Sequence, residues 1–237
     1  MPAAWGLPGW VPRRLQRLLE RERAARKGRS LEEAVFGVVD LETTGLAEDA
    51  RILEVGLVVQ RGGRTLETFE SFVDPGTAIP WSVTRLTGIN AQAVAGAPDE
   101  RGALARLDRV LARHGVEWLV AHNAPFDRRF LERGWRRADV SRPLPPCACS
   151  LRLARRLIRA KSHALGSLAV QLQIVPHARH RALGDAETAA ALWWELVQRA
   201  RIEGLHTLEA LAPLAFPGRS RPRWRLVAAV DASPGIG

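Results

Sequence analysis

The chain has 237 residues, of which 46% are hydrophobic and 25% charged, so it is long enough to bury a sizeable core without disulfide or metal staples. It has two cysteines, no tyrosine and a formal net charge of +10. These counts exclude a disulfide framework and any mechanism that uses a phenol, and they indicate nucleic acid first and an anionic membrane second as the partner.

The first 30 residues carry eight Lys and Arg residues against two Glu. Val11, Leu15, Leu18 and Leu19 fall at helical spacing, which predicts a basic amphipathic extension over 1–30. Such a helix could bind nucleic acid, lie on a membrane surface, or pack on the rest of the chain with its arginines solvated. Because the segment lacks the apolar block of a secretory signal and no apolar run could span a bilayer, we expect a cytoplasmic protein without a membrane partner.

The next three elements are expected to be strands. Residues 34–40 form an apolar run that predicts a buried strand. Two further strands are expected over 51–60 and 64–73. They are joined by Gly62-Gly63, a pair typical of the tight turn in an antiparallel hairpin.

Helical and strand patterns alternate after residue 100. Asn123 stands where it can cap the helix that follows it, with Pro125 in the first turn of that helix. The periodicity weakens past residue 205, and we expect an irregular stretch from Pro213 onward. The expected elements are helices over 101–114, 125–134, 151–160 and 182–200, and a short buried strand over 117–121.

This order of elements predicts an α/β fold in which helices flank a mixed β-sheet. We expect it to span residues 31–204, between the basic extension and a partly irregular C-terminal tail over 205–237. Residues 128–161 carry eleven basic residues against two acidic ones. Positive charge is therefore confined to this segment and the extension, and the rest of the chain is net negative.

Two carboxylates stand at the end of the first predicted strand. Asp40 and Glu42 are two residues apart, so they project from the same face of that strand. Neighbouring carboxylates repel each other unless a cation lies between them, and oxygen ligands of this kind suit Mg²⁺ or Mn²⁺. The pair is a candidate metal site, and the alternative is a solvated turn that leaves the strand.

Two further acids and a histidine occupy comparable positions later in the chain. Asp127 and Asp185 each fall in the first turn of a predicted helix, and His180 lies in the loop before the second of these helices. An acid there can simply favour the helix dipole, and a loop histidine is commonly a surface residue. Taken singly, these residues indicate little, but their order is informative.

Three motifs follow one another: D-x-E-T-T-G from Asp40, H-N-A-x-F-D from His122 and H-x4-D-A from His180. Together they resemble the three motifs of the DnaQ-like 3′–5′ exonucleases of the DEDDh branch, which includes the proofreading epsilon subunits of bacterial DNA polymerase III. The resemblance covers residues 34–200. It also takes in R-I-L-E-V-G from Arg51, L-T-G-I from Leu86 and S-L-R-L-A-R from Ser150.

The resemblance implies a ribonuclease H-like sheet and two divalent ions, Mg²⁺ or Mn²⁺, held by Asp40, Glu42, Asp127 and Asp185. It also implies His180 as the general base, since the sister branch uses a tyrosine and this chain has none. Two metal ions about 3.5–4 Å apart can activate the attacking water and stabilise the leaving oxygen of a phosphodiester.

The same resemblance implies contacts to the terminal nucleotide, with Leu46 against its base. The alternative for Phe126 is core packing, and Glu54 is expected to make a structural hydrogen bond rather than to bind metal. The implied contact residues are Thr43, Leu46, His122, Asn123 and Phe126.

A zinc site is the competing interpretation for Cys147, Cys149, His177 and His180. The C-x-C and H-x-x-H spacings are poor for structural zinc, and His180 has a better role as the base. We therefore expect Cys149 to be a small buried residue.

These observations predict a metal-dependent 3′–5′ exonuclease that hydrolyses phosphodiester bonds at single-stranded 3′ ends, of DNA rather than RNA, and releases nucleoside monophosphates. A DNA polymerase acting in trans is a candidate partner, in replication or repair. The alternatives are an RNA-trimming exoribonuclease of the same branch and, in a different class, a catalytically silent nucleic-acid-binding module.

Overall fold

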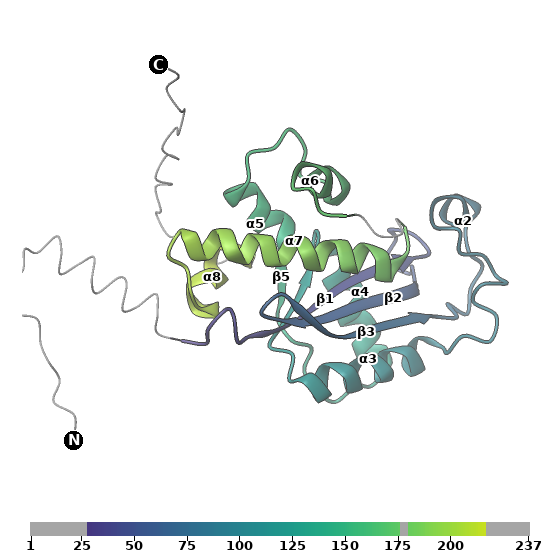
Figure 1. The fold of residues 1–237 in the computed structure, drawn as a ribbon. Coiled ribbons are helices and arrows are strands. Elements are labelled where there is room, and N and C mark those ends of the chain that lie inside the picture. The colour runs from purple at the N-terminus through teal and green to yellow at the C-terminus, as the bar shows by residue number, and fades with distance from the viewer. Residues whose placement is uncertain (1–27, 176–179, 217–237) are drawn as a thin grey trace, which may run out of the picture.

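The computed structural model describes residues 28–175 and 180–216. Most of the expected basic extension, and residues 217–237 of the expected tail, lie outside the described residues. Five strands form one sheet in the order β3-β2-β1-β4-β5 (Figure 1). The strands are β1 (Val35–Thr43), β2 (Ile52–Arg61), β3 (Arg64–Phe72), β4 (Trp118–Ala121) and β5 (Cys147–Cys149).

The sheet is mixed, as predicted. Strands β1, β2 and β3 form an antiparallel meander, whereas β4 runs parallel to β1 and β5 runs parallel to β4. Gly62 and Gly63 turn the β2–β3 hairpin with φ of 56° and 74°, a left-handed conformation that glycine adopts at little cost. The carboxyl ends of β1, β4 and β5 consequently meet at one edge of the sheet.

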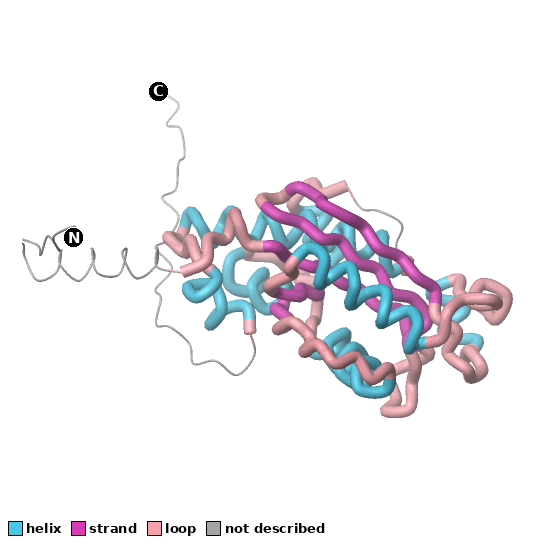
Figure 2. The backbone as a smooth tube through the Cα atoms, turned by 90° about the horizontal axis from the view of Figure 1, so that it is seen from below, coloured by secondary structure: helices cyan, strands magenta, loops and turns pink. Residues whose placement is uncertain are grey.

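Helices cover both faces of the sheet. In Figure 1, α7 lies along one face together with α5 and α6, and α3 lies below the other face. Figure 2, seen from below, shows a helix in front of the long strands that runs in nearly the same direction as they do. The helices are α2 (Trp81–Thr87), α3 (Glu100–His114), α4 (Pro125–Arg137), α5 (Ser150–Leu157), α6 (Leu165–Gln171), α7 (Ala182–Ile202) and α8 (Leu208–Ala215).

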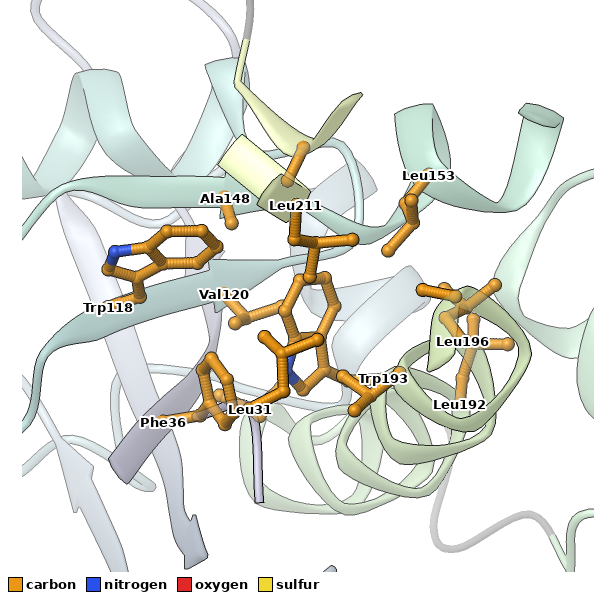
Figure 3. Packing of buried hydrophobic residues seen from close by; sticks show 14 of the residues in the cluster. Leu31, Phe36, Trp118, Val120, Ala148, Leu153, Leu192, Trp193, Leu196 and Leu211 are labelled. Atoms are coloured by element: carbon orange, nitrogen blue, oxygen red, sulfur yellow. The ribbon is translucent and has the colours of Figure 1, made fainter. Parts of the chain in front are cut away.

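The alternation of side chains along β1 divides the core into two layers. Phe36 and Val38 face the cluster built from α5, α6, α7 and α8, and Val39 and Leu41 face the cluster built from α3 and α4. Figure 3 shows the first cluster around Trp193, whose ring meets that of Phe36 edge-on at 5.4 Å. Because Asp40 has the parity of Phe36 and Val38, its backbone position places it on the face that α7 covers.

The C-terminal part of the described chain differs from the expectation of an irregular stretch from Pro213 onward. Helix α8 includes Pro213, and the side-chain oxygen of Thr207 accepts a hydrogen bond from the Ala210 amide at 3.3 Å at its start. Leu208, Leu211 and other residues of α8 are buried in the first core cluster. This burial stabilises a helix that the local pattern does not indicate, since tertiary packing routinely overrides propensity.

Three short elements were not predicted: α2, α6 and β5. The strand β5 has three residues, too few to show a period of two, and it forms by pairing with β4. The predicted cap of α4 was wrong. Ala124 is the capping residue and no side chain caps this helix, while Asn123 has a left-handed φ of 75°. None of the described helices combines the length and apolarity needed to cross a membrane.

Candidate active site

The site begins with two carboxylates on β1. Asp40 is paired in register with Gly56 of β2, and Glu42 is paired with Glu54. A register shift follows between Glu42 and Thr43, where the strand leaves the sheet. Both side chains are half-buried. The period of two therefore places both acids on one face at the end of the strand, as the sequence predicts.

Asp127 brings a third carboxylate to the same strand end from the first turn of α4. Only 3% of this residue is exposed. Its carboxylate accepts hydrogen bonds from the backbone amide of Leu41 and from its own amide. Leu41 lies between Asp40 and Glu42 in β1, so this contact ties the start of α4 to the two acids of the strand.

The start of α7 brings the remaining two residues. The backbone amide of His180 donates a hydrogen bond to Oδ2 of Asp185 at 2.9 Å, and His180 has a left-handed φ of 57°. Ligand atoms of Glu42, His180 and Asp185 all lie within 4.8 Å of one another. The structure thus brings together the five residues that the sequence proposes for catalysis, from β1, α4 and α7.

Glu54 holds the start of α7 against the sheet. Its fully buried carboxylate accepts hydrogen bonds from Ala182 N at 3.0 Å and from Nε and Nη2 of Arg181 at 3.0 and 2.8 Å. Gly56 allows the close approach, since a Cβ atom there would lie 2.1 Å from the carbonyl carbon of Ala182. The expectation of a structural hydrogen bond for Glu54 is confirmed.

The carboxylates strongly perturb one another. Burial first, and then the charges of Asp127, Asp185, Glu42 and Glu54, raise the pKa of Asp40 well above its ordinary value. Burial together with Asp185 and Glu54 raises the pKa of Glu42 to about 7. Burial raises the pKa of Asp127 to about 8, although its two backbone hydrogen bonds oppose the shift. Such a cluster is costly without a cation, because like charges are held close together away from water.

The donor set fits a hard divalent cation. Carboxylate oxygens with one imidazole suit Mg²⁺ or Mn²⁺ rather than a thiophilic metal. Cys147 and Cys149 are buried in β5, and neither belongs to a group of potential ligands among the described residues. Burial also raises the pKa of the Cys147 thiol, which disfavours the thiolate that zinc would need. His177 of the alternative zinc set lies outside the described residues.

Two of the predicted substrate contacts lie on the turn after β1. Leu46 is 75% exposed, and its carbonyl oxygen accepts a hydrogen bond from Nη2 of Arg129 at 3.2 Å. The hydroxyl of Thr43 donates to the carbonyl oxygen of Gly45 at 2.9 Å, which shapes the turn. Leu46 is therefore an exposed residue on a hydrogen-bonded turn beside the carboxylates, where it is accessible to a nucleobase.

The other three contacts follow β4. Both ring nitrogens of His122 are already in hydrogen-bond contact with protein atoms, Oγ of Ser150 at 3.0 Å and the carbonyl oxygen of His163 at 2.9 Å. Asn123 is exposed and lines a pocket beside α5. Phe126 is half-buried against Phe130, with ring centroids 5.0 Å apart. The protein contacts of His122 and Phe126 are structural, so their exposed parts alone remain for substrate.

Sequence reasoning did not single out Arg181 or the pocket beside α5. The available signal for Arg181 was its place directly after His180. Its ion-pair partner, Glu54, lies 127 residues away in the sequence. For the pocket, the available signal was the helical spacing of the arginines at positions 152, 155 and 156.

Comparison with known proteins is consistent with this geometry. A model of an exonuclease family matches residues 38–193. A protein of Mycobacterium tuberculosis named as a bifunctional exonuclease/endonuclease is 39% identical over 196 residues, which cover 77% of this chain and 29% of that protein. A DNA polymerase III PolC-type from Oceanobacillus iheyensis is 39% identical over 173 residues, covering 72% of this chain and 12% of the polymerase.

Among solved structures, exonuclease X in complex with 5′-overhanging duplex DNA superposes with a TM-score of 0.57 and 26% identity. The match covers 74% of this chain and 98% of exonuclease X. By contrast, the chain spans less than a third of the two curated relatives, so it corresponds to one part of those longer proteins.

Proposed function

The chain belongs to the DnaQ-like exonuclease family of the DEDDh type, and from this premise we propose that it is a 3′–5′ exonuclease that removes nucleoside monophosphates from single-stranded DNA ends. The observation that carries the proposal is the convergence of Asp40, Glu42, Asp127 and Asp185 with His180 at one sheet edge. Four acids arranged this way would repel a nucleic acid in the absence of metal, which argues against a module that only binds.

Divalent ions held by the four carboxylates would supply charge neutralisation and an acidified water at this site. His180 is suited to take the proton of that water, because imidazole is the side chain that most often serves as a general base in catalysis. The hydrogen bond from the His180 amide to Asp185 holds this residue beside Glu42. Leu46 and the exposed edge of Phe126 would orient the terminal nucleotide.

The names of the similar proteins favour DNA over RNA. The Oceanobacillus relative is a DNA polymerase, and exonuclease X was solved with DNA. On this basis we also propose that the chain works beside a DNA polymerase in trans. DNA and RNA oligonucleotides of equal sequence, compared directly, test the preference for DNA over RNA.

The decisive experiment uses a 5′-labelled single-stranded oligonucleotide with Mn²⁺. A 3′–5′ exonuclease produces a ladder that shortens stepwise from full length, whereas the opposite polarity releases the label at once. Asp185→Asn should abolish the ladder and retain oligonucleotide binding. If the native protein leaves the strand intact in both Mg²⁺ and Mn²⁺, the proposed exonuclease activity is refuted. If RNA of the same sequence is shortened faster than DNA, the preferred substrate is RNA.

A further inference from the structure

A pocket of about 440 Å³ opens beside the start of α5, next to the proposed catalytic edge. Its lining comes from two neighbouring strand ends: Asn123 and Pro125 follow β4, and Arg152, Arg155 and Arg156 follow β5. Strands β4 and β5 are parallel and paired at Ala121 and Cys149, so both lead into the pocket from the same edge.

The pocket lies close to the carboxylates of the proposed active site. The sheet order β1-β4-β5 places β5 two strands from the strand that carries Asp40. Adjacent strands are about 4.8 Å apart, so the strand ends are separated by about 10 Å. The side chain of Arg155 also lies close enough to His122 for its charge to lower the pKa of that ring, although burial is the larger cause.

Two of the arginines that line the pocket, Arg152 and Arg155, have no carboxylate partner among the described residues. Positions 152, 155 and 156 are three and four residues apart, so they share one face of α5. Within residues 28–175 and 180–216, neither Arg152 nor Arg155 forms an ion pair, and Nε of Arg152 is buried without a hydrogen-bond acceptor. Other arginines behave differently: Arg137 pairs with Glu100, and Arg142 pairs with Asp108.

We infer that this pocket, which we call the α5 arginine pocket, binds a backbone phosphate of the strand that remains after each cleavage. The inference rests on the proposed function and adds a subsite to it. A departing 3′-terminal nucleotide carries a single phosphate, the one under attack at the metals. Any second phosphate held by the protein therefore belongs to the retained strand. Arginine forks suit this ligand, because they donate paired hydrogen bonds to phosphate oxygens.

A phosphate bound here would set affinity rather than chemical rate. Interactions made equally in the ground state and transition state lower KM and leave kcat unchanged. The experiment compares Arg155→Gln and the double variant Arg152→Gln/Arg155→Gln with native protein on a 12-nucleotide strand and on a dinucleotide with one linkage. Arg109→Gln, an exposed arginine on α3, is the matched control.

On the 12-nucleotide strand, the double variant should raise KM on the order of tenfold, as expected for lost charged hydrogen bonds, with kcat within about twofold. The dinucleotide, which lacks a second phosphate, should show no difference. A scan should replace one linkage at a time with a neutral methylphosphonate. At one position near the 3′ end, this replacement should weaken binding of the strand to the native protein but not to the double variant. The slope of affinity against salt should fall by about one phosphate contact.

The pocket assignment would be overturned if the double variant and the native protein had equal KM values on the 12-nucleotide strand. It would also be overturned if the double variant lost as much affinity for the dinucleotide as for that strand. Arg155→Gln alone guards against misfolding, because Arg155 is exposed whereas part of Arg152 is buried. Binding measured by fluorescence anisotropy with Mn²⁺ present and Asp185→Asn added to every protein, so that the strand stays intact, separates the two proposals. If the native protein binds the strand more tightly than the arginine variants but does not cleave it, only the proposed exonuclease activity is refuted. If the native protein cleaves the strand and the arginine variants have the same KM, only the pocket assignment is refuted.

Discussion

The carboxylate of Glu54 and the guanidinium of Arg181 form an ion pair between the middle of the sheet and the start of α7, at 3.0 and 2.8 Å. Glu54 is fully buried, while the Arg181 side chain is 40% exposed, lies over the ring of Phe72 and also reaches Glu70. Arg181 follows His180 directly. The pair therefore connects the residues directly before α7 to β2 and helps to fix the positions of His180 and Asp185 relative to the sheet.

Removing Arg181 should cost both stability and activity. Arg181→Met keeps much of the stem and leaves Glu54 with the Ala182 amide as its hydrogen-bond donor, so we expect a loss of about 1–3 kcal/mol in the free energy of unfolding by urea. Cleavage should fall more than binding, because the start of α7 loosens. The comparison variant is Arg113→Met, which breaks a surface pair with Glu67 and should cost about 1 kcal/mol or less. Equal losses for the two variants would contradict a special role for Glu54–Arg181.

His180→Gln tests the base. We expect kcat to fall by about 10²–10⁴-fold with KM nearly unchanged, because a general base contributes about that much to the rate. Single-turnover cleavage in Mn²⁺ measures the chemical step. Glu195→Gln on the far part of α7 serves as the control, since Glu195 pairs with Arg199 at the surface. A decrease of less than tenfold would place the base elsewhere.

Metal and pH should act on stability together. Because the pKa values of Glu42 and Asp127 are raised to about 7 and about 8, the metal-free folded state holds protons that the unfolded chain releases. Its stability should therefore decline as pH rises from about 5 to 8.5. Mn²⁺ requires the deprotonated acids, so the Tm increase it causes should grow over the same range.

Asp127→Asn provides the control for this pH effect. The variant lacks one of the perturbed acids, so in chelator its Tm should depend less on pH than that of the native protein. Added Mn²⁺ should also raise its Tm less. Thermal denaturation with EDTA or Mn²⁺ at pH 5, 7 and 8.5 measures both effects, and a Mn²⁺ response that is independent of pH would argue against metal binding at these acids.

Gly56→Ala should disrupt the proposed active site by displacing the start of α7 from the sheet. The added Cβ would lie 2.1 Å from the backbone of Ala182, which no side-chain movement can relieve, so α7 must shift. We expect reduced thermal stability and slower cleavage. Gly102→Ala on α3 is the comparison, because its Cβ would meet side chains no closer than 3.2 Å. Native-like activity of Gly56→Ala would show that the position of α7 is not critical.

Leu46→Ala should weaken substrate binding without affecting the fold. At 75% exposure, this side chain contributes little to the core, so the free energy of unfolding should change by less than about 0.5 kcal/mol. KM for a single-stranded oligonucleotide should rise if the side chain contacts the terminal base. Unchanged KM and kcat would remove Leu46 from the substrate site.

Local patterns were sufficient for much of the fold. The hairpin at Gly62-Gly63, the buried strand that carries Asp40, and the long helix after residue 182 all show in the sequence, because turn chemistry and apolar periodicity are local properties. The spacing of Asp40 and Glu42 also determines that they share a face. The order of three motifs then indicated that Asp127, His180 and Asp185 belong with them.

Other features depended on residues far apart in the chain. Strand β5 exists because it pairs with β4, and α8 is stabilised as a helix because Leu208 and Leu211 are buried in the core cluster that also contains residues of α5 and α7. The cap predicted at Asn123 failed, because this residue adopts a left-handed turn. Short segments carry too few residues to reveal such structure by themselves.

The basic composition of the chain also shows the difference between what the sequence determines and what the tertiary structure determines. By itself, the sequence determined that positive charge gathers in two segments and that arginine provides it. Only the tertiary structure decided which arginines have carboxylate partners. Among the described residues, Arg152 and Arg155 have none, and they line a pocket beside the acids. The physical reason is that ion pairing and burial depend on distances in space between segments such as α3, α4 and α5, and these distances exist only once the sheet has formed.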